Sequence, residues 1–337
     1  MEKKIAVGIS SGGLDSLLAI KVVQKMGFQV VAMHFSIGFE PGHLNHWIDD
    51  PSSPLTAPAA LQATGARVEV VDIRDEYFPL LANPPHGTGA HCNPCIDCHA
   101  MMLNIAMGKS DELDAAFVFT GEVLGQRPMS QNRQSLDMVA RISGLGDKLL
   151  RPLSGALLPP TAPEKQGIIS RKDLLDIQGR SRTRQIELAA EFSITDYPAP
   201  AGGCLLTDEN YCSRLEDLFK RRPEKILQRD DPLLLFVGRH IILPQGAKVI
   251  IGRNERENGV IERFAHLGYL LEATRYPGPV ALVERPASEE DILAAARLCA
   301  RYGKGRSEQL VEIMIRNDSD EKTTQVQPGE PEQTLML

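Results

Sequence analysis

The sequence of 337 residues lacks a long hydrophobic run, an excess of positive charge and a rich supply of aromatic side chains. No stretch approaches the roughly 18 apolar residues that cross a bilayer, which excludes a membrane-spanning helix. The apolar residues 5–9 run directly into polar Ser10, so we expect no secretory signal and a cytoplasmic protein. Because 37 Lys and Arg face 44 Asp and Glu, nucleic-acid binding through overall basicity is excluded, but a local basic face is not.

The composition is that of a folded globular protein. Hydrophobic residues make up 42% and charged residues 24% of the chain, which excludes disordered, collagen-like and fibrous classes. The length predicts two domains, or one large domain with an appendage. Six cysteines are too few to indicate a disulfide framework in a chain of this length, but three of them fall within residues 92–98.

The first third of the chain alternates strand patterns with helix patterns. Short apolar runs predict strands, and runs with helical periodicity predict helices between them. The strands are expected at residues 4–10, 28–35, 67–73 and 116–120, and the helices at 15–26, 57–64 and 95–108. This order predicts βαβ units and an α/β fold with a doubly wound parallel sheet.

The rest of the chain predicts a second, smaller α+β domain. A charged amphipathic helix is expected from residue 213, a β-rich stretch from 236 and a helix over 287–302. The end of the chain is polar, which predicts a disordered tail. The expected parts are an adenylating domain over 1–208, a helical connector over 209–235, a small domain over 236–316 and the tail over 317–337.

A loop rich in serine and glycine joins the first strand to the first helix. Backbone N–H groups released by glycine geometry, together with a helix N-terminus, form a cradle for phosphate. The lysine of a Walker loop and the Gly-x-Gly-x-x-Gly pattern of a dinucleotide fold are both absent. The alternative interpretation is a strand-to-helix turn capped by Ser11 or Asp15.

The full string Ser11-Gly-Gly-Leu-Asp-Ser16 resembles the pyrophosphate loop of the PP-loop superfamily, the adenylating ATP pyrophosphatases with an adenine nucleotide α-hydrolase-like fold. The resemblance implies ATP as cofactor and Mg²⁺ held through Asp15, in keeping with the preference of that ion for a carboxylate and phosphate oxygens. It implies a nucleotide site made of Ser10, Ser11, Gly12, Gly13, Asp15, Ser16, Gly121 and Phe35. Core packing is the alternative role for Phe35.

Two cysteines lie at the start of an expected helix. Asn93 is a plausible N-cap and Pro94 suits the first helical position, so Cys95 and Cys98 share one helix face. Two thiols on one face can ligate a metal or a cluster, or form a redox pair. His91 and His99 flank them, so structural zinc is an alternative. Cys204 supplies a third thiol from a remote Gly-Gly-Cys turn.

Further strings resemble the tRNA-thiolating branch of the same superfamily, the group related to the tRNA 2-thiouridylase and the 4-thiouridine synthetase. They lie within residues 1–208 and are Asn93-Pro-Cys-Ile-Asp-Cys98, Thr120-Gly-Glu122, Gly125-Gln-Arg-Pro-Met-Ser-Gln131, Arg151-Pro-Leu153 and Gly202-Gly-Cys-Leu-Leu-Thr207. The resemblance implies Asp15, Cys95, Cys98 and Cys204 as catalytic residues. It implies a [4Fe–4S] cluster on the three cysteines, with a metal-free persulfide relay and Zn²⁺ as alternatives.

Two parts of the chain are expected to contact RNA. Arg180, Arg182 and Arg184 alternate just before a helix, where each guanidinium can pair with phosphate. A solvated helix face with internal ion pairs is the alternative. The strings over 237–241 and 247–258 resemble the RNA-binding domain of the NFACT family, which implies Arg239, Lys248 and Arg253 as RNA contacts. Dimerisation or substrate gating is the alternative role of this domain.

The expected function is therefore ATP-dependent thiolation of a tRNA uridine, by adenylation of a carbonyl oxygen followed by sulfur transfer. The partners implied are tRNA, a sulfur donor (a cysteine desulfurase or sulfide) and, as one assembly, a homodimer. Asp97 and Glu122 are candidate acid–base groups, or alternatively caps or solvated side chains. The alternatives for the whole protein are an adenylating enzyme that acts on a small molecule and a non-catalytic RNA-binding protein.

Overall fold

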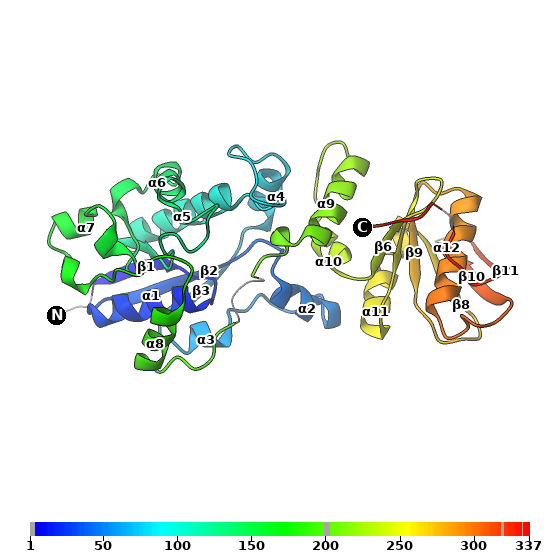
Figure 1. The fold of residues 1–337 in the computed structure, drawn as a ribbon, viewed down its shortest axis with the longest axis horizontal. Coiled ribbons are helices and arrows are strands. Elements are labelled where there is room, and N and C mark those ends of the chain that lie inside the picture. The colour runs from blue at the N-terminus through cyan, green and yellow to red at the C-terminus, as the bar shows by residue number, and fades with distance from the viewer. Residues whose placement is uncertain (1–3, 199–202, 318–319, 332) are drawn as a thin grey trace. The chain divides into compact units, whose positions relative to one another are not determined.

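The computed structural model describes residues 4–198, 203–317, 320–331 and 333–337 (Figure 1). The chain divides into two compact units. The first unit contains residues 1–41 and 54–207, and the second contains 42–53 and 208–337. Among the described residues, no helix combines the length and the apolar character needed to cross a membrane.

The first unit is built on a parallel sheet of five strands in the order β3-β2-β1-β4-β5. The strands are β1 (Ile5–Ile9), β2 (Gln29–Ser36), β3 (Arg67–Asp72), β4 (Val118–Thr120) and β5 (Leu149–Leu150). Strand β1 is central and pairs with β2 on one side and β4 on the other. The predicted parallel α/β sheet is confirmed, because all four neighbouring strand pairs are parallel. Parallel neighbours require crossover connections, which the intervening helices supply.

Helices cover both faces of this sheet (Figure 1). Helix α1 (Leu14–Lys25) packs against β1, β2 and α8 (Thr183–Glu191), while α5 (Cys95–Glu112) packs against β1, β4 and α6 (Arg133–Ile142). Side chains of α1 and α8 form a buried cluster with the sheet, which includes Leu17, Phe119 and Leu188. The remaining α-helices of this unit are α3 (Ala59–Gln62), α4 (Arg74–Ala82) and α7 (Ala162–Lys165).

Helix α2 (Pro41–Asp49) lies almost wholly in the segment 42–53, which belongs to the second unit. Its Asp49 accepts two hydrogen bonds of 2.7 Å from Arg256, and its Trp47 carbonyl accepts bonds of 3.2 and 3.3 Å from Arg263. The periodicity of the sequence did not indicate α2. Its anchors lie about 200 residues further along the chain, so only the tertiary fold reveals them.

The second unit contains a seven-stranded sheet in the order β11-β10-β8-β9-β7-β6-β12. The strands are β6 (Arg239–Ile242), β7 (Lys248–Ile251), β8 (Gly268–Ala273), β9 (Ala281–Glu284), β10 (Val311–Arg316), β11 (Glu321–Val326) and β12 (Leu335–Met336), all paired antiparallel. Helix α12 (Glu289–Tyr302) packs against the sheet. The other helices are α9 (Glu209–Arg221), α10 (Asp231–Phe236) and α11 (Glu255–Arg263). This α+β architecture is the one predicted.

The prediction of a disordered tail from residue 317 is wrong. Strand β11 pairs antiparallel with β10 from Val311–Val326 to Arg316–Glu321, and β12 pairs with β6. Val326 is 4% exposed and belongs to the core beneath α12. The residues of β11 are polar although they form a strand, because β11 lies at the edge of the sheet and most of its side chains face solvent.

Candidate nucleotide and thiol site

The carboxyl ends of β1 and β4 meet where the strand order of the first unit reverses. Strands β2 and β3 follow β1 on one side, and β4 and β5 lie on the other. In open parallel sheets this reversal leaves a crevice at the carboxyl edge, which is the usual ligand site. The serine–glycine loop leaves β1 at this edge, and Gly121 and Glu122 leave β4 beside it.

The loop over residues 10–13 is tied together by its own hydroxyl groups. The Gly12 amide donates to Ser10 Oγ and the Gly13 amide to Ser11 Oγ, both at 3.3 Å. Ser10 Oγ donates to Ser16 Oγ at 3.0 Å, and Ser16 Oγ donates to the Gly13 carbonyl at 2.8 Å. These bonds hold the loop against the first turn of α1, with Gly13 in the N-cap position.

Two glycines let neighbouring segments approach the loop closely. Gly12 has φ +75°, and a Cβ there would lie 2.6 Å from Pro58 Cγ. A Cβ on Gly121 would lie 2.6 Å from the backbone N and Cα of Ser16. Gly121 therefore lies directly against the N-terminus of α1, which supports its predicted place in the nucleotide site. Phe35 is 6% exposed in β2, so its predicted adenine contact stays a prediction.

Asp15 has one carboxylate oxygen fixed and the other unpaired. Gln126 Nε2 donates to Asp15 Oδ2 at 2.7 Å. Asp15 Oδ1 is buried and has no hydrogen-bond partner among the residues that the structure describes. A buried carboxylate oxygen without a partner calls for a cation or a donor from outside the chain. The Mg²⁺ that the resemblance implies fits this atom, because Mg²⁺ in nucleotide sites binds few carboxylates and several phosphate oxygens.

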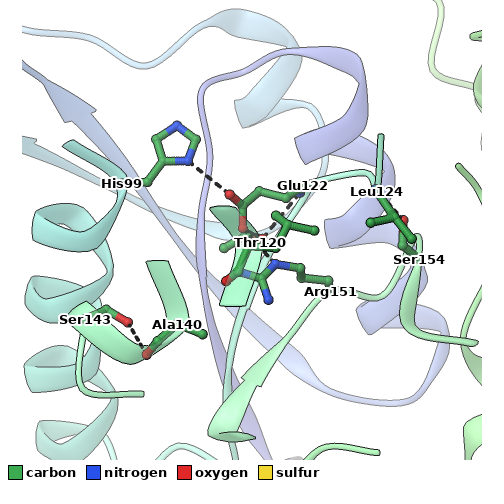
Figure 2. Close-up of polar contacts among 9 residues, drawn as sticks. His99, Thr120, Glu122, Leu124, Ala140, Ser143, Arg151 and Ser154 are labelled. Carbon is green, nitrogen blue, oxygen red and sulfur yellow. Dashed lines mark hydrogen bonds and ion pairs between the residues drawn. The ribbon is translucent and has the colours of Figure 1, made fainter. Parts of the chain in front are cut away.

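Glu122 is held by ion pairs, as Figure 2 shows. Arg151 Nε lies 2.8 Å from Glu122 Oε2 and His99 Nδ1 lies 3.1 Å from Oε1. Burial alone would raise the pKa of Glu122, but the charges and hydrogen bonds of Arg151 and His99 outweigh it and lower that pKa to about 2. A carboxylate with this pKa stays ionised near neutral pH, so Glu122 fits a structural role better than that of a proton donor.

The cysteine motif begins helix α5, but its capping differs from the expectation. The helix starts at Cys95, and Pro94 rather than Asn93 occupies the N-cap position. Asn93 Nδ2 instead donates to Cys95 Sγ at 3.1 Å. Asp97 is buried and accepts from both the backbone and the ring of His86, at 3.0 and 2.6 Å. Asp97 therefore anchors the loop that precedes the cysteines.

The fold brings the remote Cys204 to the two cysteines of α5. The Leu205 amide donates to the Phe39 carbonyl at 2.9 Å, which fixes the turn against the loop that follows β2. Phe39 contacts Tyr77 of α4 edge to face at 6.2 Å between ring centroids. Tyr77 in turn is hydrogen-bonded to Cys98 and lies near Cys204 and Cys95. Gly202 of the Gly-Gly-Cys motif lies outside the described residues.

The thiols lie close enough to influence one another. The pKa of Cys98 is well above its usual value because of burial, and then because of the neighbouring Cys204 and Cys95. Burial also raises the pKa of Cys204 to about 12, with Glu40 and Cys95 contributing. Both groups are therefore neutral thiols near pH 7 when nothing is bound to them.

A metal cluster does not fit the cysteines as they are arranged. Throughout residues 4–198, 203–317, 320–331 and 333–337, no three His, Cys, Asp or Glu side chains are grouped so that they could hold a metal ion. Cys95, Cys98 and Cys204 are therefore neighbouring free thiols rather than a preformed metal site. Cysteine side chains are chemically suitable ligands, since iron–sulfur clusters are held by thiolates. In this structure, however, Cys98 is buried and hydrogen-bonded to Tyr77.

One segment connects the phosphate loop with the thiols. Gln126 bonds to Asp15, and its neighbour Arg127 lies near enough to Cys204 for its positive charge to oppose the rise in the pKa of that thiol. The segment is fixed by the Gly125 amide, which donates to the Gln131 carbonyl at 2.7 Å. The segment over 126–127 thus lies between the nucleotide loop, which Gln126 contacts, and the thiols, which feel the charge of Arg127.

The arginines expected to contact RNA differ in their surroundings. Arg180 is exposed, whereas Arg184 pairs with Glu187 at 3.0 Å and Glu191 at 3.3 Å, as the solvated-face alternative predicts. Arg182 is half-buried, and its Nε has no partner among the described residues. The start of α8 borders a pocket of about 330 Å³, which Ser181, Thr183 and Arg184 help to line. A contact of these arginines with RNA stays a prediction.

In the second unit, Lys248 is not placed to contact RNA. Its side chain is 1% exposed, and its ammonium lies 3.0 Å from Asp217 of α9. The expectation is wrong because all four residues of β7 are buried. Arg253 pairs with Glu257 at 2.8 Å and stays partly exposed, and Arg239 lies over the Tyr302 ring at 4.6 Å. These two remain candidates.

Sequence reasoning missed several residues of the site. Gln126 and Arg127 lie within the string Gly125–Gln131, but their residue types did not indicate that Gln126 bonds to Asp15 or that Arg127 lies near Cys204. Tyr77 and Glu40 lie in segments for which no element or role was predicted. Only their position in the sequence could have indicated them. Glu40 follows β2 and Tyr77 follows β3, and segments that follow parallel strands begin at the carboxyl edge of the sheet.

The fold and the loop define the first unit as an α/β domain of the PP-loop type. The family model described as "Thiamine biosynthesis protein (ThiI)" matches residues 2–158, and the model "NFACT protein RNA binding domain" matches residues 238–335. Both resemblances drawn from the sequence are therefore confirmed by family models, each over its own segment of the chain. A search of curated proteins finds no match.

Three solved structures are similar at low identity. A 4-thiouridine synthetase–RNA complex with bound ATP is 19% identical over 68% of this chain and 53% of that one, with a TM-score of 0.39. A predicted tRNA methyltransferase subunit from Methanocaldococcus jannaschii is 15% identical over 68% and 94%, with a TM-score of 0.35. The C-terminal part of a Streptococcus suis fibronectin/fibrinogen-binding protein is 12% identical over 76% and 88%, with a TM-score of 0.26. These likenesses are too distant to carry an argument about function, and this chain spans about half of the synthetase structure.

Proposed function

We propose that this protein adenylates a tRNA uridine with ATP and replaces the activated oxygen by sulfur carried on Cys95, Cys98 and Cys204. The observation that carries the proposal is the segment over 126–127, in which Gln126 bonds to the carboxylate of the phosphate loop and Arg127 lies near enough to Cys204 for its charge to act on the pKa of that thiol. ATP activates the carbonyl oxygen of the uridine, and sulfur then attacks the carbon of the same carbonyl group. The phosphate loop and the thiols therefore have to lie side by side.

In the first stage, a uridine carbonyl oxygen attacks the α-phosphorus of ATP, and pyrophosphate leaves toward the loop over residues 10–13. The positive end of the α1 dipole, at the N-terminus of that helix, favours the departing charge. Magnesium bound at Asp15 Oδ1 would neutralise phosphate charge. The uridine has to leave its base stack to reach this edge, as chemistry on a nucleobase ordinarily requires.

In the second stage, sulfur attacks the adenylated carbon and AMP departs with the original oxygen. The thiols as they stand suit a persulfide on one cysteine, whose outer sulfur attacks the carbon. A second cysteine then attacks the inner sulfur, which releases the thiocarbonyl product and leaves a disulfide that an external thiol must reduce. A [4Fe–4S] cluster on the same residues is the other form of the proposal and would require the thiols to rearrange. Anaerobic purification with iron and acid-labile sulfide analysis distinguishes the two.

The proposal is tested by measuring pyrophosphate release from ATP with and without bulk tRNA, and thiolated nucleosides by mass spectrometry. We expect tRNA-dependent release and a thiouridine product with a sulfur donor present. Asp15→Asn should abolish both signals. Cys204→Ser should abolish the thiouridine while pyrophosphate release continues. Cys299→Ser is the matched control, because Cys299 is a buried core cysteine of the second unit and should leave both signals unchanged.

A small-molecule acceptor is the second candidate, and the description of the matching family as a thiamine biosynthesis protein favours it. Pyrophosphate release that needs a metabolite and not tRNA would replace the first proposal by this one. Absence of turnover with tRNA and with metabolites, from protein that binds RNA, would overturn both in favour of a non-catalytic RNA-binding role. Adding a cysteine desulfurase or sulfide to separate reactions identifies the sulfur donor.

A further inference from the structure

Two amide side chains link the phosphate loop to helix α8. Gln126 Nε2 donates to Asp15 Oδ2 at 2.7 Å, and Gln185 Nε2 donates to Gln126 Oε1 at 3.4 Å. The three residues come from three separate segments: the start of α1, the loop after β4 and α8. They form one continuous chain of hydrogen bonds that ends on the carboxylate of the loop.

The direction of this chain is fixed by the donors and acceptors available. A glutamine amide has one accepting and one donating end, and a carboxylate can only accept. Because Gln185 donates to the carbonyl of Gln126, the NH₂ group of Gln126 must face Asp15. Gln185 is 0% exposed, so water cannot readily replace its donor. Its own Oε1 has no partner among the described residues, so the donation to Gln126 is the one side-chain bond that these residues give it.

We infer that Gln126 and Gln185 are positioning residues that hold the Asp15 carboxylate with Oδ1 directed at the magnesium ion of bound ATP. We call the hydrogen bonds from Gln185 to Gln126 and from Gln126 to Asp15 the relay. The relay occupies Oδ2, whereas Oδ1 is buried without a partner among the described residues and is left for the ion. The inference rests on the proposed function, because it assigns the partner of the same loop. It also gives α8, whose first turn includes Arg184, a role in the nucleotide site.

The test measures binding of α,β-methylene-ATP, which cannot be cleaved between the α and β phosphates, by calorimetry with Mg²⁺ and with excess EDTA. The wild-type protein should bind the magnesium form more tightly. Gln185→Glu does not touch Asp15 but places an acceptor against Gln126 Oε1, so Gln126 should turn its carbonyl toward Asp15. We expect the preference for magnesium to fall roughly tenfold or more, the range of one hydrogen bond to a charged group. Binding without magnesium should change little.

A double-mutant cycle separates the relay from a general loss of structure. Gln126→Leu should reduce the preference similarly, and Gln126→Leu with Gln185→Glu should reduce it no further, because Gln185 acts only through Gln126. Gln134→Leu, an exposed glutamine of α6, is the control and should bind as wild type. Circular dichroism checks folding, and Gln126→Leu alone tests the relay if Gln185→Glu does not fold.

The outcomes distinguish the inference from the function on which it rests. A magnesium preference in the wild type that neither variant alters would overturn the relay and leave the proposed function intact. Additive effects of the two substitutions would also overturn it. A wild-type protein that binds the analogue neither with nor without Mg²⁺ would overturn the proposed function, and the relay with it.

Discussion

At the scale of single residues, the site depends on groups that hold one another rather than on isolated reactive side chains. Ser10 and Ser16 use their hydroxyl protons within the loop, and Asp97 uses its oxygens on His86. The carboxylate of Glu122 is occupied by Arg151 on one oxygen and by His99 on the other. Asp15 Oδ1, in contrast, is buried without a hydrogen-bond partner among the described residues and is therefore available to an outside partner. Residue type alone did not indicate which groups were occupied and which were available.

Gly121→Ala should disrupt the nucleotide loop. The added Cβ would lie 2.6 Å from backbone atoms of Ser16, which cannot rotate away as a side chain could. We expect about 1–3 kcal/mol lower stability from overpacking and roughly tenfold or more weaker ATP binding. Equilibrium dialysis with ATP and thermal denaturation measure the two effects. Gly108→Ala in α5 is the control, because open space surrounds its Cβ, and it should stabilise the helix slightly. Equal ATP binding by both variants would contradict the close approach.

The ion pairs of Glu122 predict a stability that depends on acid pH. The folded-state pKa of about 2 lies below the ordinary 4.5, so the stabilisation is complete above about pH 5 and is lost as pH falls toward 2. It should amount to about 3 kcal/mol, and Glu122→Gln should flatten this part of the pH profile while weakening the unit at neutral pH, since Arg151 loses its partner. Native-state hydrogen exchange of the β4 amides is the measurement. Glu112→Gln, an exposed carboxylate, should keep the wild-type profile, and a steep profile in Glu122→Gln would refute the assignment.

At the scale of elements, the sequence predicted those that carry a strong hydrophobic period. Strands β1 to β4 and helices α1 and α5 lie where the alternation of apolar runs placed them. Helix α4 contains Pro79, and α2 lies mostly in the second unit through the bonds of Arg256 and Arg263, so neither has a clear local signal. Strand β11 is polar because it is an edge strand. The sequence therefore did not predict elements that are stabilised by residues far away in the chain.

Val326→Ala tests whether β11 belongs to the folded second unit. Val326 is 4% exposed in the core beneath α12, so truncating it should lower stability by about 2 kcal/mol. The single tryptophan, Trp47, belongs to the second unit, so its fluorescence during urea denaturation reports on that unit. Lys322→Ala is the matched control on an exposed position of the same strand and should change stability by less than about 0.5 kcal/mol. A tail without structure would show no difference between the two.

At the scale of the whole molecule, charge limits how RNA can be bound. The formal charge of −7 means that any RNA contact has to come from local basic groups against an unfavourable average field. Burial removes Lys248 from the candidates, whereas Arg184 and Arg253 stay partly exposed but are already paired with glutamates. The candidate arginines that remain lie at the start of α8 and in the second unit. Contacts of such groups with phosphate release counterions, so binding through them should depend on salt.

Replacing Arg180, Arg182 and Arg184 together by alanine should lower the salt dependence of tRNA binding. Three phosphate contacts on single-stranded RNA contribute a slope of about 2 in log affinity against log salt. Filter binding at a series of NaCl concentrations measures it. Lys220→Ala, an exposed lysine of α9, should leave the slope near the wild-type value. An unchanged slope in the triple variant would place RNA binding outside this segment.

The sequence by itself determined the parallel α/β sheet, the serine–glycine loop at the start of α1 and the pair of cysteines at the start of α5. These depend on contacts within one or two turns or on the periodicity of neighbouring residues, which local order encodes. The tertiary structure alone decided that Gln126 bonds to Asp15, that Cys204 lies beside Cys98 through the contact of Leu205 with Phe39, and that Lys248 is buried. Those outcomes depend on segments far apart in the chain meeting at one edge of a sheet, which no local pattern records.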